Sequence, residues 1–209
     1  DVSLSRYDGE GRYRSLVIEL NRRADNGWGF KSNVTFGKSE DNNSNERATL
    51  TNSSVYTPNP ASPLEAYALS DNDRQMRGVL AWYAPGVFGI KISGIFTYST
   101  GLPWTATYST DQNGDGQSID YMWGRNTMRQ LDTKTYDMRI SRNFRIAKHF
   151  SLEGIIDVYN VFNWANQYIS FSNRSFATGP TSTKFANFAQ VDTPDQKTRE
   201  VQFTLKARF

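Results

Sequence analysis

Apolar and polar residues alternate strictly at the carboxyl end of the chain. Val201, Phe203, Leu205, Ala207 and Phe209 occupy every second position, with polar or charged residues between them. A period of two residues is typical of a β-strand that has one apolar and one polar face. Outer-membrane barrels end on such a strand, with one face against lipid and an aromatic residue at the membrane interface. The alternative is an edge strand at the end of a soluble sandwich.

The same alternation recurs in five earlier segments, and an apolar segment at 74–83, whose lipid-facing side the pattern does not fix, brings the prediction to about seven strands in all. The expected strands span residues 12–23, 28–38, 74–83, 88–98, 136–146, 150–162 and 199–209. The first, third and fifth strands are followed by tight turns, such as the Asn-Gly turn that ends at Gly27. The second, fourth and sixth are followed by long polar segments, which we place at 39–73, 108–135 and 163–197.

The alternation of short and long connections distinguishes a transmembrane barrel from a soluble β-sandwich. Loops of roughly 30 residues are uncommon in a compact soluble domain, where connections have a median of roughly 4 to 6 residues. A transmembrane meander has short periplasmic turns and long extracellular loops. The sequence therefore predicts an all-β fold, an antiparallel transmembrane β-barrel segment in the outer membrane of a Gram-negative bacterium.

Composition excludes several other classes. The 209 residues have a mean hydropathy of −0.64, and no run approaches the roughly 18 to 20 apolar residues that a membrane-spanning helix needs. Aromatic residues make up 14%, too many for a disordered chain. The absence of cysteine excludes disulfides and a cysteine nucleophile. The net charge of +3 is spread without a basic stripe, so we expect no nucleic-acid partner.

No set of residues predicts catalysis. The single histidine, His149, lies in an expected turn beside Lys148 and has no partner residue at a telling spacing. The chain contains no G-x-S-x-G, no histidine pair for a metal and no phosphate-binding loop. We expect that the protein is not an enzyme and requires no cofactor.

One segment resembles the first half of a calcium-binding loop. Asp111, Asn113 and Asp115 place oxygen ligands at alternate positions before a glycine. The second half departs from the pattern, because its twelfth position is Met122 instead of glutamate, although Asp120 lies nearby. The two readings are a calcium ion, Ca2+, held by these residues and a polar external turn without metal.

Charged residues of two consecutive strands are expected to face the lumen. Asp137 and Arg139 lie on one strand, and Glu153 and Asp157 lie on the next. Because both strands carry their polar residues at odd numbers around one turn, Arg139 should lie opposite Asp157 or one step diagonal to it. Such charges either line a transport path, or form a ladder in the barrel wall or hold a plug.

Aromatic residues gather at the expected strand ends. This distribution is typical of the aromatic girdles that flank the membrane-facing band of a barrel. The candidates for contact with the membrane interface are Trp28, Phe150 and Phe209 near the short turns, and Phe36, Tyr98, Trp104, Phe162 and Trp164 near the long loops.

Five short motifs occur in a fixed order along nearly the whole chain. They are Y-R-S-L to N-G-W within 12–28, S-T-G-L-P-W at 99–104, D-Q-N-G-D-G at 111–116, D-V-Y-N-V-F-N at 157–163 and Q-F-T-L-K-A-R-F at 202–209. In this order they resemble the C-terminal barrel region of large TonB-dependent outer-membrane receptors, especially the Oar-like group.

The resemblance implies a partial barrel. Those receptors resemble 22-stranded barrels that are filled by a plug, so residues 1–209 would form the C-terminal part of the barrel without a plug domain. Partners would be outer-membrane lipid, the N-terminal remainder of the barrel and plug (in the same polypeptide or as a separate chain), TonB through that plug, and the barrel-assembly machinery through the strand that ends at Phe209.

The function implied by the resemblance is energised uptake of a bulky nutrient. In that case the chain supplies barrel wall, and its three external loops contact the ligand. The alternative is a structural or adhesive surface barrel whose loops bind partners without active transport. External loops vary freely in length and composition, so the sequence does not name the ligand.

Overall fold

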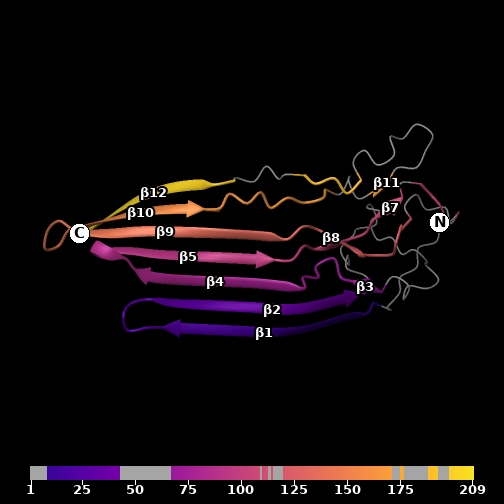
Figure 1. Cartoon of the computed structure of the whole chain (residues 1–209), viewed down its shortest axis with the longest axis horizontal. Helices are drawn as coiled ribbons and strands as arrows, with labels where there is room; N and C mark the ends of the chain where they lie inside the picture. Colours follow the sequence, from indigo (N-terminus) through magenta and orange to yellow (C-terminus); the bar gives the residue numbers. More distant parts are fainter. Residues whose placement is uncertain are drawn as a thin grey trace.

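Seven long antiparallel strands form the body of the protein, in a computed structural model that describes residues 9–42, 67–108, 110–112, 114, 120–170, 175–176, 188–192 and 198–209. The long strands are β1 (Gly11–Arg23), β2 (Gly29–Asp41), β4 (Met76–Pro85), β5 (Ile90–Ser99), β9 (Thr133–Arg145), β10 (Ser151–Tyr159) and β12 (Glu200–Arg208). Each pairs with the next along the chain, which makes the sheet a meander (Figure 1). The predicted all-β fold of about seven strands is confirmed.

The strand bounds differ from the prediction by a few residues, for identifiable reasons. β9 begins at Thr133 and not at Tyr136, because its ladder with β5 continues as far as the Ser99–Thr133 pair. β10 ends before the predicted Phe162 because Asn160 takes a left-handed conformation with φ of 49°. The backbone N–H of Asn160 then donates to an Asp137 carboxylate oxygen at 2.8 Å, so the chain leaves the sheet there.

The connections sort to the two ends of the sheet. The turns β1–β2, β4–β5 and β9–β10 lie at one end, here called the turn end, and the long connections lie at the other, the loop end (Figure 1). At the first turn, Gly27 has a φ of 85°, which favours glycine, and Ala24 N–H donates to the Trp28 carbonyl at 3.0 Å. Among the described residues, no helix is long and apolar enough to cross a membrane.

The register gathers most of the large apolar residues of the seven strands on one face, the outer face. Ile18 lies opposite Val34, and Ile156 lies between Ile140 and Phe203. The Phe203 side chain remains 75% exposed. The outer face comprises Leu16, Ile18, Leu20, Phe30, Val34, Phe36, Leu80, Trp82, Ile92, Phe96, Met138, Ile140, Ile156, Val158, Phe203 and Leu205. A contiguous apolar surface of this extent indicates a membrane-facing or protein-facing side.

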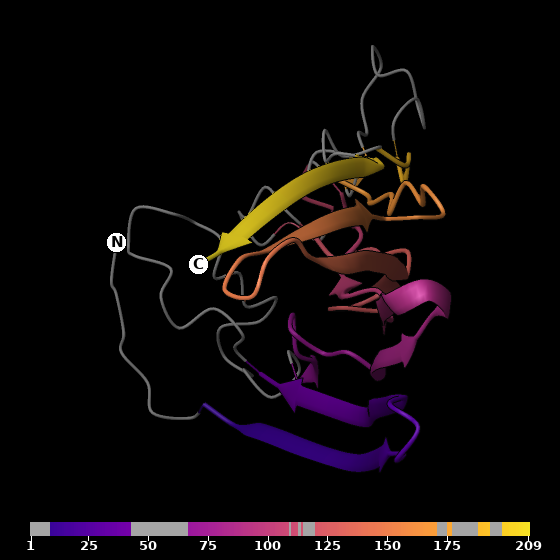
Figure 2. The ribbon, with the colours of Figure 1, turned by 90° about the vertical axis from the view of Figure 1, so that its left-hand side faces the viewer.

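The opposite face, the inner face, is mainly polar, and part of it is buried. Ser141, Ile155 and Asp157 lie on it and are all buried, with Ile155 only 5% exposed. Seen from the turn end, the sheet is a curved open arc (Figure 2). Side chains converge on the concave side of a curved sheet and diverge on the convex side, so this difference in burial places the polar residues inside the arc.

The loop end has structure of its own. Short strands β6 (Pro103–Trp104) and β8 (Met128–Arg129) pair antiparallel, β7 (Thr107–Tyr108) and β11 (Ser175–Phe176) pair parallel, and β3 (Ala68–Leu69) extends the sheet beside β2. We call residues 67–75, 101–108, 120–132, 164–170 and 188–192 the loop cluster. The described parts of all three predicted external segments lie at this end; residues 43–66, 109, 113, 115–119, 171–174, 177–187 and 193–197 of those segments are outside the described residues.

Candidate functional site

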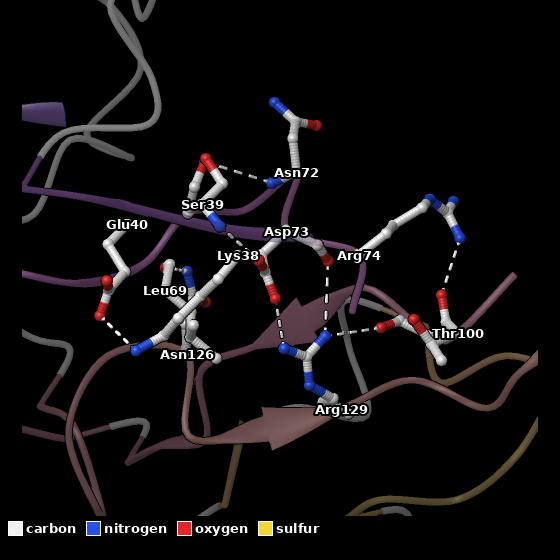
Figure 3. Close-up of polar contacts among 12 residues, drawn as sticks. Lys38, Ser39, Glu40, Leu69, Asn72, Asp73, Arg74, Thr100, Asn126 and Arg129 are labelled. Atoms are coloured by element: carbon white, nitrogen blue, oxygen red, sulfur yellow. Dashed lines mark hydrogen bonds and ion pairs between the residues drawn. The ribbon is translucent and has the colours of Figure 1, made fainter. Parts of the chain in front are cut away.

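A buried ion pair joins the first and second long segments. Asp73, which precedes β4, is 1% exposed, and its carboxylate pairs with the Arg129 guanidinium of β8 (Figure 3). The same carboxylate accepts the backbone N–H of Ser39 in β2 at 2.6 Å. Arg129 also donates to the Gly101 carbonyl at 3.0 Å. A buried carboxylate needs a charged partner and hydrogen bonds, and Asp73 has both.

A second set of contacts joins the same two segments. The Asn126 side-chain amide donates to the Leu69 carbonyl and to an Asp71 carboxylate oxygen, each at 2.6 Å. Arg125 donates to the Asp41 carbonyl at 2.7 Å and to the Asp41 carboxylate at 2.6 Å. Arg125 and Asn126 therefore bind both the end of β2, at Asp41, and the residues in and just after β3, Leu69 and Asp71.

Tyr121 lies near two residues of this second set, Arg125 and Asp71, whose charges act on its hydroxyl. Burial raises the pKa of its hydroxyl above the usual value near 10, and the positive charge of Arg125 offsets part of that effect. The hydroxyl consequently stays neutral at physiological pH, so the charge of this part of the loop cluster comes from its arginine and aspartate residues.

The third long segment joins the other two through Gln130. Its side-chain oxygen accepts the Ile169 N–H at 2.6 Å, and its side-chain amide donates to the Ile169 carbonyl at 2.8 Å. Beneath this contact, Trp104, Ala106 and Ile169 form a small buried core, against which Phe188 packs with its ring centroid 6.2 Å from that of Trp104. The three segments thus form one connected surface at the loop end.

The position of Trp104 corrects an expectation. We expected this residue at the membrane interface, but it is 1% exposed and lies inside the loop cluster, where no lipid can reach it. The cause is local: after β5 ends, the chain pairs with β8 instead of continuing along the sheet. Its partner Met128 lies in the segment 108–135, which we expected to be an external loop.

The other seven interface candidates lie at or near the two ends of the sheet. Phe150 and Phe209 stack with centroids 5.5 Å apart, and the half-buried Trp28–Phe30 pair lies at the same turn end. Phe162 and Trp164 pack 4.9 Å apart at the loop end. The other two candidates are Phe36 and Tyr98, which lie near the loop-end limits of β2 and β5. Contact of these residues with the membrane stays a prediction.

Charged residues of β9 and β10 meet on the inner face. Arg139 lies opposite Asp157 in the register and binds its two carboxylate oxygens at 2.6 and 3.0 Å. Glu153, on the same face, is 3.4 Å from Arg208 of β12. The structure therefore brings the four predicted lumen charges onto one face, with Asp137 bound to the backbone of Asn160.

Only part of the calcium candidate can be placed. An Asp111 carboxylate oxygen accepts the Gly114 N–H at 2.6 Å, and Asp120 accepts the N–H of Gln112. Asn113 and Asp115 lie outside the described residues. Among the described residues, no group of three acidic, histidine or cysteine side chains could hold a metal ion. Calcium binding here stays a prediction.

Sequence reasoning missed the residues that assemble the loop cluster. Asp73, Arg125, Asn126 and Arg129 show no periodicity, and each contact joins residues that are far apart in the chain. A usable signal was the segment D-N-D-R at 71–74, with three charged residues among four, which stands out after a long stretch rich in Asn, Ser, Thr and Pro.

Comparison with known proteins identifies the family. Residues 1–123 match a family model described as an outer membrane beta barrel domain, which is more than half of the 209 residues. No curated protein and no solved structure matched the chain. The matched region runs from β1 into the second long segment, and β9, β10 and β12 continue the same sheet beyond it. The chain therefore belongs to the outer membrane beta-barrel family, and its location is the outer membrane of a Gram-negative bacterium.

Proposed function

We propose that this chain forms wall and external surface of a TonB-dependent receptor, similar to the Oar-like group, that imports a bulky nutrient. The observation that carries the proposal is the open arc of the sheet, with β1 and β12 at its edges (Figure 2). Lipid offers no partners for unpaired backbone groups, so both edges need further strands. Barrels of about 22 strands enclose a plugged lumen, which is the architecture that energised uptake uses.

The loop cluster supports a ligand-contacting role. Its three segments are already tied together by the Asp73–Arg129 pair and by the contacts of Asn126 and Gln130. A surface that is ordered before the ligand arrives loses less conformational entropy on binding. We therefore assign ligand contact to the exposed side of the loop cluster, and wall and plug contacts to the charged inner face.

The remaining partners follow from this assignment. The additional strands and the plug come either from the same polypeptide or from a separate one, and TonB acts on the plug and not on this sheet. The assembly machinery recognises β12, whose outer face and terminal aromatic residue suit a strand delivered to lipid. In this proposal the chain catalyses no covalent step during uptake.

Uptake measurements in cells test the proposal. Cells that lack the protein and cells that lack TonB are compared with wild-type cells for accumulation of fluorescent peptides, proteins and oligosaccharides. We expect both deletions to abolish accumulation of one probe class, while cells without TonB still bind that probe at the surface. Surface binding with accumulation that does not depend on TonB would favour the structural or adhesive alternative.

An intact-mass inventory of the purified barrel provides a second test. The protein is extracted from the outer membrane in detergent and measured before and after boiling. We expect the unheated barrel to contain further strands and a plug, in one polypeptide or in a companion released on boiling. A closed barrel without any plug would remove the transport mechanism.

A further inference from the structure

An apolar groove lies on the outer face near the turn end, across β9, β10 and β12. Its volume is about 420 Å³, and it opens outward. Gly154 forms part of its lining, and the side chains around it are Ile90, Ile140, Phe144, Ile156 and Leu205. This groove interrupts the otherwise continuous apolar surface that faces the membrane.

The groove exists because a glycine occupies a position where the neighbouring strands carry large side chains. Gly154 pairs with Arg142 on one side and with Leu205 on the other. A Cβ atom at Gly154 would have its nearest neighbour, the Phe144 ring, at 3.9 Å, which is ordinary contact. A larger residue would therefore fit. Glycine inside a strand weakens it and often marks a site where another group approaches closely.

A cation borders this groove on the same face. Arg142 is exposed, and its guanidinium lies 4.8 Å from the centre of the Phe144 ring, on the side toward the turn end. Within the described part of the chain, Arg142 has no acidic partner. An arginine that faces lipid is costly near the middle of the membrane and less so near the interface, which its long side chain can reach.

We propose that this groove binds one phospholipid of the periplasmic leaflet. One acyl chain occupies the groove over Gly154, and the phosphate accepts hydrogen bonds from the Arg142 guanidinium. The charges are complementary, and the guanidinium and the groove lie side by side at the turn end, where the stacked Phe150 and Phe209 rings mark the expected interface. The site rests on membership of the family and not on transport, so it stands or fails separately from the receptor function.

The two parts of the site contribute differently. Lipid tails are as apolar as the groove, so the groove selects a chain only through packing and not through the hydrophobic effect. The hydrogen bonds between guanidinium and phosphate are charge-assisted, and a loss of about 1.4 kcal/mol there corresponds to about a tenfold loss of affinity. Loss of either part should therefore weaken retention of the lipid in detergent.

Native mass spectrometry of the detergent-purified protein tests the groove. The probe is dioleoyl phosphatidylglycerol, with dioleoylglycerol as the same pair of chains without phosphate. We expect one bound phosphatidylglycerol in the wild type, and about a tenfold smaller bound fraction in Gly154→Leu, whose side chain fills the groove. The matched control is Gly78→Leu on the same face, where a Cβ would also lie 3.9 Å from its nearest neighbour, Val34. This control should retain the lipid.

A second pair of variants tests the cation. Arg142→Gln should lower binding of phosphatidylglycerol about tenfold and leave binding of dioleoylglycerol unchanged. Its control is Arg22→Gln, since Arg22 also lies on the outer face at the turn end, 4.8 Å from the centre of the Trp28 ring. Equal losses in the two arginine variants, or full retention in Gly154→Leu, would overturn the proposal.

Crosslinking uses the wild-type protein alone, so its result does not depend on whether a substituted variant folds. A phosphatidylglycerol with a photoactivatable acyl chain is added to the purified protein and irradiated, and the modified peptides are identified. We expect adducts to concentrate on residues 140–156 and 203–205. Adducts spread evenly over the outer face would show ordinary surrounding lipid and would refute a specific site.

Discussion

The sheet and the loop cluster bury opposite kinds of residue. In the sheet, large apolar side chains such as Phe203 are exposed, while Asp157 and Ser141 on the other face are covered. In the loop cluster, Trp104 and Ala106 are buried in a small core, as in a water-soluble protein. One chain therefore carries two arrangements, each suited to the solvent around it: lipid beside the strands and water beyond their ends.

The two regions should also differ in how they respond to single substitutions. The sheet distributes its stability over long backbone ladders, each with many paired residues. The loop cluster depends on a few side-chain contacts between distant segments. Loss of one such contact should therefore remove a larger fraction of the free energy that stabilises the loop cluster than loss of one residue pair removes from the sheet.

The largest effect is expected for Asp73→Ala. This change leaves the Arg129 guanidinium and the Ser39 N–H without their carboxylate, and breaking a buried ion pair in this way costs about 3 to 5 kcal/mol. We expect rapid proteolysis of the loop cluster in the folded barrel, measured by time-resolved digestion and mass spectrometry.

Asp71→Ala provides the control for that prediction. Asp71 belongs to the same segment, but its side chain is 56% exposed, so its removal should cost less than about 1 kcal/mol. Equal digestion rates for the two variants would show that the buried pair does not hold the loops.

A charge on the outer face should have the next largest effect. Leu80 and Val79 are adjacent in β4, but their side chains lie on opposite faces of the sheet. Leu80→Arg places a cation against lipid and should lower the free energy of unfolding by about 2 to 4 kcal/mol. The measurement is urea titration of the barrel in phosphatidylcholine vesicles.

The same titration of Val79→Arg supplies the comparison within one strand. On the inner face the new cation meets polar neighbours, and we expect a change below about 1 kcal/mol. If Val79→Arg were the more damaging of the two, the assignment of the faces would be reversed.

Gly101→Ala should affect the loop cluster without altering the sheet. A Cβ at this position would overlap the backbone carbonyl of Gln130, which must then move, at a cost of about 1 to 3 kcal/mol. We expect faster amide hydrogen exchange in β6 and β8 and unchanged exchange in β4. Gly11→Ala, whose Cβ would meet its nearest neighbours at an ordinary contact distance of 3.9 Å, should leave both regions as they are; protection of β6 and β8 in Gly101→Ala would contradict the prediction.

The smallest effect is expected for Lys31→Ala. Lys31 pairs with Glu19 at 3.0 Å, but both side chains are more than half exposed, and such pairs contribute under about 1 kcal/mol. Urea titration should place this variant within about 0.5 kcal/mol of the wild type. A loss comparable to that of Asp73→Ala would mean that burial is not what distinguishes the two ion pairs.

The sheet could be predicted from sequence because each strand carries its own signal. Alternation within β12 or β1 needs no knowledge of the neighbours, and the phase around one turn was enough to place Arg139 against Asp157. Tight turns then fix the register of adjacent strands. Membership of the outer membrane beta-barrel family agrees with this prediction.

The loop cluster could not be predicted, because its contacts have no local signature. Asp73 and Arg129 are 56 positions apart, and nothing in either neighbourhood indicates the other. Trp104 shows how proximity along the chain misleads: it follows a strand closely, yet Gly101 and its hydrogen bond to Asp132 turn the chain away from the sheet. An aromatic residue after a strand can therefore enter either region.

The meander has a consequence for how the protein reaches its folded state. Each long strand pairs with the long strands that precede and follow it in sequence order, and three of the six pairings are hairpins closed by short turns. A short turn closes its hairpin at a small entropic cost, and the cost of closing even a long loop grows only slowly with its length. The hairpins β1–β2, β4–β5 and β9–β10 can therefore form early and dock one after another. The contacts of Asp73, Asn126 and Gln130 at the loop end then form last, on strands that are already in register.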